Sequence, residues 1–265
     1  MRTVDYTDQT TIVTGASSGI GTAFSRELAR RGSDVVLVAR RLDRLERLAA
    51  ELEAEHGVAA TPVPLDLSVP RAGRALATEL AVRDIAVTGL VNNAGFATVG
   101  LLHEEEPDRL VDEINVNVAN LVDLTRAFIE PLRRAGSGIL VNVASMAAYA
   151  PSPGMAVYSA AKTFVLDFTE SLWVESRGTG LRVLALSPGL TRTEFFDDLG
   201  GAYRGSYQTP QKVVRTAMDA LDRGRAPSVH SGWAGGAAAL ASRLLTRRRA
   251  AILSGAISAR SRARG

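Results

Sequence analysis

The sequence predicts an α/β protein built on a doubly wound parallel sheet. Short apolar, β-branched runs alternate with amphipathic stretches from the start of the chain to about residue 230. A length of 265 residues suits one large domain, and 46% hydrophobic with 22% charged residues is ordinary for a soluble globular protein. No repeat or proline-rich linker divides the chain. We therefore expect one domain over 1–230, including a loop at 190–209, and a basic C-terminal tail over 231–265.

The expected elements follow in order. TTIVT at 10–14 is typical of a buried strand, and the next stretch predicts a helix with Ile20, Phe24 and Leu28 on one face. Further strands are expected at 34–39, 59–65, 88–92, 138–144, 181–187 and 226–230. Further helices are expected at 41–57, 69–82, 107–134, 157–177 and 210–223. In such a sheet the ligand lies at the carboxyl ends of the strands.

Charge is distributed unevenly along the chain. After Asp222 no acidic residue follows but nine arginines do, so the first 222 residues carry a net charge of −6 and the remainder +9. This alanine- and leucine-rich end, as a basic amphipathic helix beginning near Trp233, would suit weak contact with an anionic membrane surface. A solvated, partly disordered tail is the simpler interpretation. We expect no nucleic-acid partner, because Trp233 is the only aromatic residue there and no binding motif surrounds it.

Other sequence features limit the location and the chemistry. The absence of cysteine excludes disulfides and thiolate catalysis and is compatible with a cytoplasmic location. The N-terminal MRTVDYTDQT lacks the apolar core of a signal peptide, and no apolar run reaches the roughly 18 residues of a spanning helix. His56, His103 and His230 form no pair at metal-ligand spacing, so no metal site is expected. We expect a cytoplasmic protein, with peripheral membrane contact only through its tail.

A glycine-rich turn, TGASSGIG, follows the first strand, with Gly15, Gly19 and Gly21 in a GxxxGxG spacing. Such a turn between a strand and a helix lets backbone amides and the helix N-terminus approach a pyrophosphate. It is not a P-loop, because no Lys-Ser/Thr pair follows the last glycine. Its position at the head of the alternation favours a dinucleotide and a Rossmann-like sheet.

The end of the second strand indicates which dinucleotide. A carboxylate there would hydrogen-bond the ribose 2′-hydroxyl of NAD, whereas an arginine accommodates a 2′-phosphate. The chain has Ala39, Arg40 and Arg41 at this point, which favours NADP(H) over NAD(H). The alternative is that these arginines merely begin a surface helix.

A lysine in the stretch YSAAK is unusual for this chain. Of 31 basic residues only Lys162 and Lys212 are lysines. Lysine, unlike arginine, offers a compact amine that releases its proton when buried. Tyr158 lies four residues earlier and therefore on the same face of a helix. The pair is a candidate acid–base site.

Together these motifs resemble the short-chain dehydrogenase/reductase family over about residues 9–230. TGASSGIG resembles the family's dinucleotide turn, NNAG at 92–95 its sheet-supporting motif, and PGLTRT at 188–193 its nicotinamide motif. The resemblance implies a catalytic tetrad of Asn117, Ser145, Tyr158 and Lys162. It implies cofactor contacts from Gly15, Ser17, Ser18, Gly19, Ile20, Gly21, Arg40, Asp66, Leu67, Asn93, Ala94, Gly95, Tyr158, Lys162, Pro188, Gly189, Thr191 and Thr193.

The implied activity is the interconversion of a carbonyl compound and an alcohol with NADP(H). Tyr158 would donate the proton to the substrate oxygen or remove it, and Ser145 would hold that oxygen by a hydrogen bond. Lys162 would favour the phenolate and bind the ribose, and Asn117 would anchor a water that relays protons. One departure is Asn120, which stands where the family often has glycine, so helix packing there is expected to differ.

Substrate selection is expected from 94–102, from 147–157 and from the loop after Pro188. Their residues are largely apolar, which suggests a hydrophobic ketone or alcohol such as a 3-oxoacyl thioester, a steroid-like compound or an aromatic carbonyl. Alternatively Phe195 and Phe196 only anchor the loop. The apolar and aromatic residues concerned are Phe96, Met146, Tyr149, Met155, Phe195 and Phe196.

Two other functions stay open. The Tyr–Lys pair also serves epimerisation or dehydration of nucleotide sugars, although the glycine spacing argues against it. The other is an NADP(H)-binding regulator without turnover, although relatives of that kind usually lose the tyrosine or the lysine. The resemblance also implies a homodimer or homotetramer formed through the helices around 107–134 and 157–177.

Overall fold

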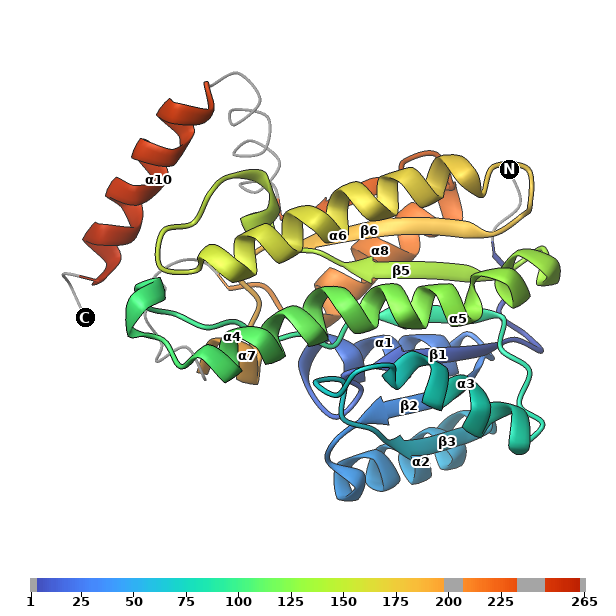
Figure 1. Ribbon diagram of the computed structural model, residues 1–265. Coiled ribbons are helices and arrows are strands. Elements are labelled where there is room, and N and C mark those ends of the chain that lie inside the picture. The colour runs from blue at the N-terminus through green and yellow to red at the C-terminus, as the bar shows by residue number, and fades with distance from the viewer. Residues whose placement is uncertain (1–3, 198–206, 233–245, 263–265) are drawn as a thin grey trace.

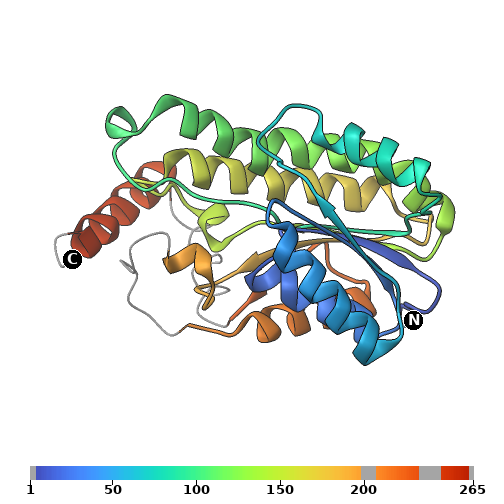
Figure 2. The same cartoon turned by 90° about the horizontal axis from the view of Figure 1, so that it is seen from below.

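The fold is a parallel sheet between two layers of helices (Figures 1 and 2). The computed structural model describes residues 4–197, 207–232 and 246–262. Within this part the sheet has seven strands in the order β3-β2-β1-β4-β5-β6-β7, and all neighbours pair in parallel. The strands are β1 Thr10–Thr14, β2 Asp34–Ala39, β3 Ala60–Pro64, β4 Gly89–Asn92, β5 Ile139–Val143, β6 Arg182–Pro188 and β7 Ser228–Ser231. This confirms the predicted doubly wound sheet.

Two groups of helices cover the two faces of the sheet (Figure 2). The described helices are α1 Gly19–Arg30, α2 Leu42–His56, α3 Ala72–Val82, α4 Pro107–Ile114, α5 Asn120–Ala135, α6 Ala156–Glu175, α7 Glu194–Asp197, α8 Pro210–Arg223 and α10 Arg247–Arg262. Short 3₁₀ turns occupy Leu102–Glu104 and Met146–Tyr149. Helices α1, α2 and α8 pack on one face, and α3, α5 and α6 pack on the other, with α4 continuing that second layer.

The strands are buried on both faces, which explains their continuous apolar sequence. Successive side chains of β2 point in opposite directions. Val35 and Leu37 join the core formed with α1, α2 and α8, whereas Val36 and Val38 join the core formed with α3 and α5. The order of the strands reverses between β1 and β4, which are neighbours in the sheet. A ligand of such a sheet binds outside the carboxyl ends of the strands at this point.

A buried chain of polar side chains connects the central strands to α5 and α6. The Asn92 amide donates to Thr125 Oγ1 at 3.0 Å and to Asn142 Oδ1 at 2.9 Å. Asn142 in turn donates to Thr169 Oγ1 at 2.9 Å. Both side-chain NH₂ groups are buried and donate hydrogen bonds, so this chain links β4 and β5 beneath the ends of the strands.

The structure differs from the expected elements in two places. The helix expected over 107–134 is continuous but contains a π-helical segment, Asn115–Ala119, between α4 and α5. Such bulges insert a residue into the helical ladder and are frequent at functional sites. The expected loop at 190–209 contains α7 and a bridge between Thr191 and Gln208, and its residues 198–206 lie outside the described part.

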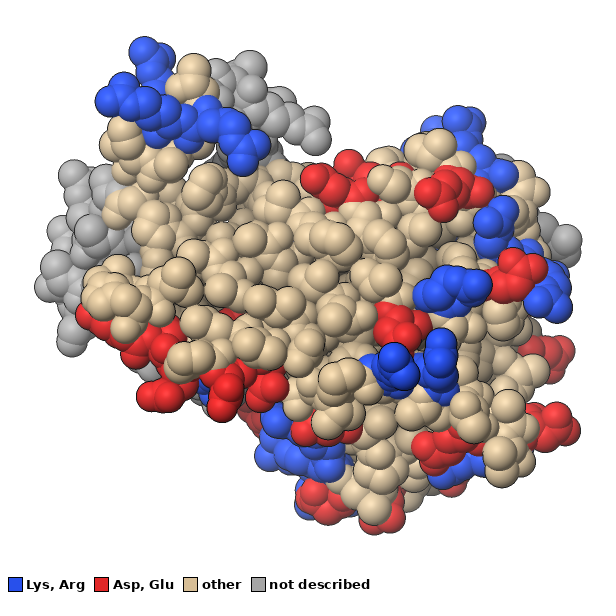
Figure 3. Space-filling view, viewed as in Figure 1, with Lys and Arg blue, Asp and Glu red and all other residues tan. Residues whose placement is uncertain are grey.

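The basic C-terminal end contains a helix, α10, at the side of the molecule (Figure 1). Ser254 Oγ donates to the carbonyl of Pro151, so α10 lies against the loop before α6. Figure 3 shows a concentration of arginine side chains on this helix. Residues 233–245, which include Trp233, and residues 263–265 lie outside the described residues. No helix in the described ranges is long and apolar enough to cross a membrane.

Asn120, the residue that departs from the family pattern, makes three hydrogen bonds at the start of α5. Its buried side chain accepts a hydrogen bond from the amide of Ala72 at 3.0 Å. It also donates to the carbonyls of Leu67 at 2.7 Å and Val69 at 2.8 Å. One side chain therefore ties the start of α5 to the loop between β3 and α3.

We expect Asn120→Gly, which restores the residue common in the family, to destabilise the protein. The change leaves the amide of Ala72 and the carbonyls of Leu67 and Val69 without this partner, and one buried unsatisfied group costs about 1–3 kcal/mol. The free energy of unfolding should fall by roughly 2–4 kcal/mol in urea titrations. Asn115→Ala, on the preceding turn, is the control, and an equal loss in both variants would contradict the assignment.

Candidate active site

The glycine-rich turn forms the first wall of the site, between β1 and α1. Gly15 and Gly19 have φ of 67° and 55°, in the left-handed region that other residues avoid. A side chain at Gly21 would place its Cβ 2.2 Å from the carbonyl oxygen of Gly15, so only glycine fits there. Ser17, Ser18 and Ile20 lie on this turn and are half-buried. The turn and the helix N-terminus have the form that receives a pyrophosphate.

Thr14, the last residue of β1, holds the NNAG segment against this turn. Its hydroxyl accepts the amides of Asn93 at 2.9 Å and Ala94 at 3.0 Å. The Asn93 side chain donates back to the Thr14 carbonyl at 2.8 Å. Gly95 follows, and a Cβ there would lie 2.6 Å from Asn117 Oδ1 and 3.3 Å from Lys162 Nζ. The segment therefore connects the dinucleotide turn to the predicted catalytic residues.

The predicted Arg40 and its neighbour Arg41 follow β2, beside the glycine-rich turn. Arg40 is exposed and makes no described hydrogen bond, whereas Arg41 donates to Ser17 Oγ from Nη2 at 3.1 Å. Arg41 also pairs with Glu194 Oε2 at 2.9 Å, and Arg44 pairs with Glu194 Oε1 at 2.6 Å. Hydrogen bonds from Arg44 and Arg41 hold the pKa of the Glu194 carboxyl below its ordinary value. Glu194 thus links the loop after Pro188 to two arginines beside the glycine-rich turn.

Asp66 and Leu67, two of the predicted cofactor contacts, lie in the loop after β3. Asp66 is exposed, and its carboxylate accepts the amide of Ser68 at 2.9 Å. Leu67 is buried, and its carbonyl accepts from Asn120 at 2.7 Å. These contacts fix the loop at the carboxyl end of β3, on the same edge of the sheet as the glycine-rich turn.

Tyr158 and Lys162 lie together on the first turns of α6, as their spacing predicts. Both are buried, with 8% and 4% of their surface exposed. Lys162 Nζ lies 5.6 Å from the centre of the Tyr158 ring and donates to the carbonyl of Val143 at 2.9 Å. Burial lowers the pKa of Lys162 to about 8, although the charge of Glu113 opposes the shift. A positive charge beside a phenol favours the phenolate.

Ser145 follows β5 at the carboxyl end of the strand. Its Oγ accepts the amide of Ala147 at 3.1 Å and so caps the short 3₁₀ turn. The centre of the Phe195 ring lies 5.6 Å from that of the Tyr158 ring, so the loop after Pro188 lies against the tyrosine.

Asn117 lies in the π-helical segment and is fully buried. Its amide donates to the carbonyls of Phe96 at 2.8 Å and Glu113 at 3.0 Å. Its Oδ1 is buried without a hydrogen-bond partner among the described atoms, and it faces Gly95. An unpaired buried oxygen of this kind is a place for a water or a ligand group.

The PGLTRT motif closes the site on the side of β6. Pro188 ends the strand, and Thr191 Oγ1 donates to the carbonyl of Gly189 at 2.8 Å. Thr193 lies against Gly19, where a Cβ would come within 2.8 Å of Thr193 Cγ2. The motif therefore faces the start of α1 across the end of the sheet.

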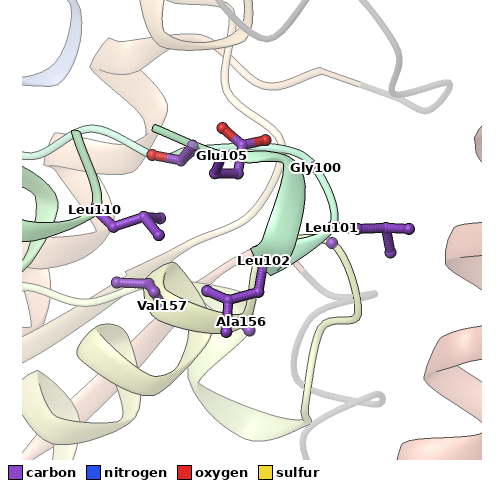
Figure 4. Close-up of a pocket in the computed structure, with 9 residues that line it drawn as sticks. Gly100, Leu101, Leu102, Glu105, Leu110, Ala156 and Val157 are labelled. Carbon is purple, nitrogen blue, oxygen red and sulfur yellow. The ribbon is translucent and has the colours of Figure 1, made fainter. Parts of the chain in front are cut away.

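A small hollow opens between the start of α6 and the segment before α4 (Figure 4). Leu102, Leu110 and Val157 give it an apolar lining, and the Glu105 side chain lies beside Gly100. Its residues come from 98–110 and 154–157, which overlap two of the segments expected to select the substrate. Tyr149 instead stacks on His230 with ring centres 4.8 Å apart, and the side chain of Phe196 is not described.

All predicted site segments therefore meet at the carboxyl ends of the strands. The family model described as "short chain dehydrogenase" matches residues 9–203, which contain these segments. The chain belongs to the short-chain dehydrogenase family. It is an oxidoreductase of the short-chain dehydrogenase/reductase type, which acts on alcohol or carbonyl groups.

Relatives agree with this assignment. A short chain dehydrogenase of Pseudocercospora fijiensis is 38% identical over 70% of this chain and 60% of that relative, so the match spans less than two thirds of its length. Sulfoacetaldehyde reductase 2 of Chromohalobacter salexigens is 37% identical over 69% of this chain and 73% of that protein. The solved structure of a short-chain dehydrogenase from Sphingobium yanoikuyae with NADPH has 33% identity and a TM-score of 0.80, covering 89% and 93% of the two chains.

Sequence reasoning did not single out two residues of this short-chain dehydrogenase, Thr14 and Glu113. Thr14 could have been found from its place at the end of the first strand. Arg41 was named beside Arg40, but its contact with Ser17 required the structure. Glu113 is buried and accepts the amide of Thr98 at 3.0 Å through Oε2. Its one sequence signal is a carboxylate one helical turn before Asn117.

Proposed function

We propose that this enzyme interconverts a hydrophobic ketone or aldehyde and the corresponding alcohol with NADP(H), using Tyr158 as the acid–base group. The observation that carries the proposal is the buried Lys162 ammonium over the Tyr158 ring. In reduction the phenol gives its proton to the substrate oxygen, and in oxidation the phenolate removes it. Ser145 donates a hydrogen bond to the same oxygen and stabilises the charge that develops on it. Asn117 anchors the water through which Lys162 exchanges protons with solvent.

The residues present fit a nicotinamide dinucleotide. Gly15, Gly19 and Gly21 leave room for backbone contact with its pyrophosphate, and Gly95 keeps the wall beside Lys162 open. When bound, the cofactor supplies or accepts a hydride at the substrate carbon. Lys162 would hold its ribose, and Thr191 and Thr193 its carboxamide. Of the remaining predicted contacts, Asp66 and Leu67 would hold the adenine.

A hydrophobic substrate is supported by the lining of the hollow at the start of α6. Leu102, Leu110 and Val157 line it, and Leu101 and Leu102 remain 43% and 61% exposed. Phe195 adds an aromatic ring over Tyr158. Burying such side chains against a ligand contributes about 25 cal/mol per Å² of apolar surface, which favours a substrate with a large apolar group.

NADPH oxidation at 340 nm across 3-oxoacyl thioesters, steroid ketones, diketones and aromatic aldehydes tests the proposal. We expect turnover to rise with the apolar area of the substrate. Faster turnover of small polar carbonyls, sulfoacetaldehyde included, would reject the hydrophobic class. Binding of NADPH without turnover on any carbonyl would favour the regulator, and turnover of a nucleotide sugar without net oxidation would favour the epimerase.

The preference for NADP(H) predicts a specific effect of Arg41→Ala. A charge-assisted hydrogen bond is worth about 1.5–3 kcal/mol, so losing one to the 2′-phosphate should raise the KM for NADPH roughly 10- to 100-fold. The KM for NADH should change far less, because NADH has no such phosphate. Steady-state kinetics with both cofactors measure the ratio, and Arg40→Ala measures the share of the neighbouring arginine.

Arg47→Ala is the matched control for this prediction. Arg47 lies on the same helix, α2, and pairs with Asp43 at 2.8 Å on an exposed surface. Its loss should leave both KM values unchanged. If Arg40→Ala and Arg41→Ala also leave the ratio of the two KM values unchanged, the preference for NADP(H) is wrong.

We also propose a homodimer or homotetramer formed through the outer helix layer. Figure 3 shows a broad uncharged area over this face. Val111 and Ile114 on α4, with Phe164 and Val174 on α6, are exposed there. Contact of α10 with an anionic membrane surface is a second, weaker proposal, supported by its exposed Ile252 and Leu253 beside three arginines.

A further inference from the structure

Two charged side chains are buried among the described residues, and both belong to this site. They are Lys162, at 4% exposed, and Glu113, at 0%. Isolated buried charges are strongly unfavourable, so charges that remain inside a protein are generally paired or hydrogen-bonded. The mechanism proposed above uses Lys162 and gives Glu113 no part.

Glu113 is held by the segment that follows NNAG. Its Oε2 accepts the amide of Thr98 at 3.0 Å, and its other oxygen, Oε1, is buried without a hydrogen-bond partner among the described atoms. Its backbone carbonyl accepts the Asn117 amide, which also donates to Phe96 at 2.8 Å. Glu113 and Asn117 thus hydrogen-bond to Thr98 and Phe96 from the same turn of helix.

The same turn reaches Lys162. Asn117 Oδ1 and Lys162 Nζ face the same point beside Gly95, at 2.6 Å and 3.3 Å from a Cβ built there. The charges of Glu113 and Lys162 act on each other, and each favours the ionised form of its partner. Burial raises the pKa of the Glu113 carboxyl, and Thr98, Arg109 and Lys162 oppose that shift. Arg109 is exposed and lies over the Phe96 ring, so solvent screens its charge more than that of Lys162.

We propose that Glu113 is a positioning residue of the active site: its carboxylate is the buried counter-charge that keeps Lys162 an ammonium beside Tyr158. It acts through Lys162 and does not touch the substrate. The carboxylate favours the ammonium, the ammonium favours the phenolate, and the phenolate removes the proton during alcohol oxidation. The inference rests on the function proposed above only in this last step.

The two lysines of the chain make a direct test possible. In protein labelled with ¹³C and ¹⁵N at lysine, NMR should show two side-chain signals, from Lys162 and from the exposed Lys212 on α8. Lys162 should titrate near its lowered pKa of about 8, and Lys212 serves as the internal reference. In Glu113→Gln, which keeps the shape and an acceptor for Thr98, the midpoint of Lys162 should fall by about 1 pH unit or more.

A matched control and a second measurement make the result decisive. Asp112→Asn removes an exposed charge from the adjacent position and should leave Lys162 unchanged. In the pH–rate profile of alcohol oxidation, the acid limb should move to higher pH in Glu113→Gln but not in Asp112→Asn. If the NMR titration midpoint of Lys162 is the same in the wild type and in Glu113→Gln, the proposal is overturned, whether or not the enzyme turns over a carbonyl.

The wild type alone also tests the inference, should Glu113→Gln fail to fold. Two coupled groups titrate in two steps that each group reports. The Lys162 signal should therefore show a second, smaller inflection at acidic pH, where Glu113 takes up its proton. A single-step Lys162 titration in the wild type would reject the pairing.

Discussion

Replacing Tyr158 by phenylalanine is expected to lower kcat by roughly 10²- to 10⁴-fold, the usual contribution of a positioned general acid or base. The ring remains to pack under Phe195 and beside Lys162, so the fold and the binding of NADPH should persist. Only the proton donor is removed. Stopped-flow hydride transfer, with NADPH binding followed by fluorescence, separates the chemical step from cofactor affinity.

Tyr149→Phe is the matched control for this variant. Tyr149 lies on the 3₁₀ turn after β5, and its hydroxyl forms a hydrogen bond with Ser187 Oγ at 3.2 Å. It is a second tyrosine near the same strand ends, and its loss should change kcat by less than about 10-fold. Similar losses in both variants would indicate a structural effect, and near-normal turnover in Tyr158→Phe would remove the tyrosine from the mechanism.

The sequence predicted the fold because the signals that specify it are local. A strand buried on both faces must be apolar throughout, and TTIVT and DVVLVA satisfy this with no knowledge of their neighbours. The site segments were predictable for a related reason. Most of them directly follow a strand, and a parallel sheet brings all carboxyl ends to one edge, so separate motifs in the chain become neighbours in space. Asn117 and the Tyr158–Lys162 pair instead reach this edge from helices.

What the sequence did not predict depends on contacts between distant segments. Arg40 and Arg41 are equivalent in the sequence, and only the distance to Ser17 distinguishes them. Glu113 belongs to a stretch with several acidic residues, and its burial against Thr98 follows from the path of a loop. Asn120 was noticed as a departure, but its role required the position of the loop before α3. Side-chain partners across elements are set by tertiary packing, which local patterns do not encode.

Replacing Lys162 by methionine is expected to lower kcat and to remove a pH dependence of the free energy of unfolding. The ammonium stabilises the Tyr158 phenolate and would hold the cofactor ribose, so kcat should fall at least about 100-fold. Lys162→Arg should not restore it. Lys162 is 4% exposed, so the larger guanidinium would have to displace buried neighbours, and it does not release its proton.

The stability effect follows from the lowered pKa of Lys162, about 8 in the folded protein. An unfolded chain has a lysine pKa near 10.4, so between these values the unfolded state binds more protons than the folded state. The free energy of unfolding therefore rises with pH through this window, and below pH 8 the full cost of the buried ammonium remains. At about 1.36 kcal/mol per pKa unit, that cost is on the order of 3 kcal/mol.

Lys162→Met removes this titration, so its free energy of unfolding should stay level between pH 7.5 and about 9.5 where that of the wild type rises. Urea titrations across this range compare the two proteins directly. Burial also raises the pKa of Tyr6, but that group lowers stability only above its ordinary value near 10 and does so in both proteins. Parallel curves would show that Lys162 titrates at its ordinary pKa. A residue that destabilises the fold while it is charged is then retained for its chemistry, which explains a buried lysine in a chain where 29 of 31 basic residues are arginine.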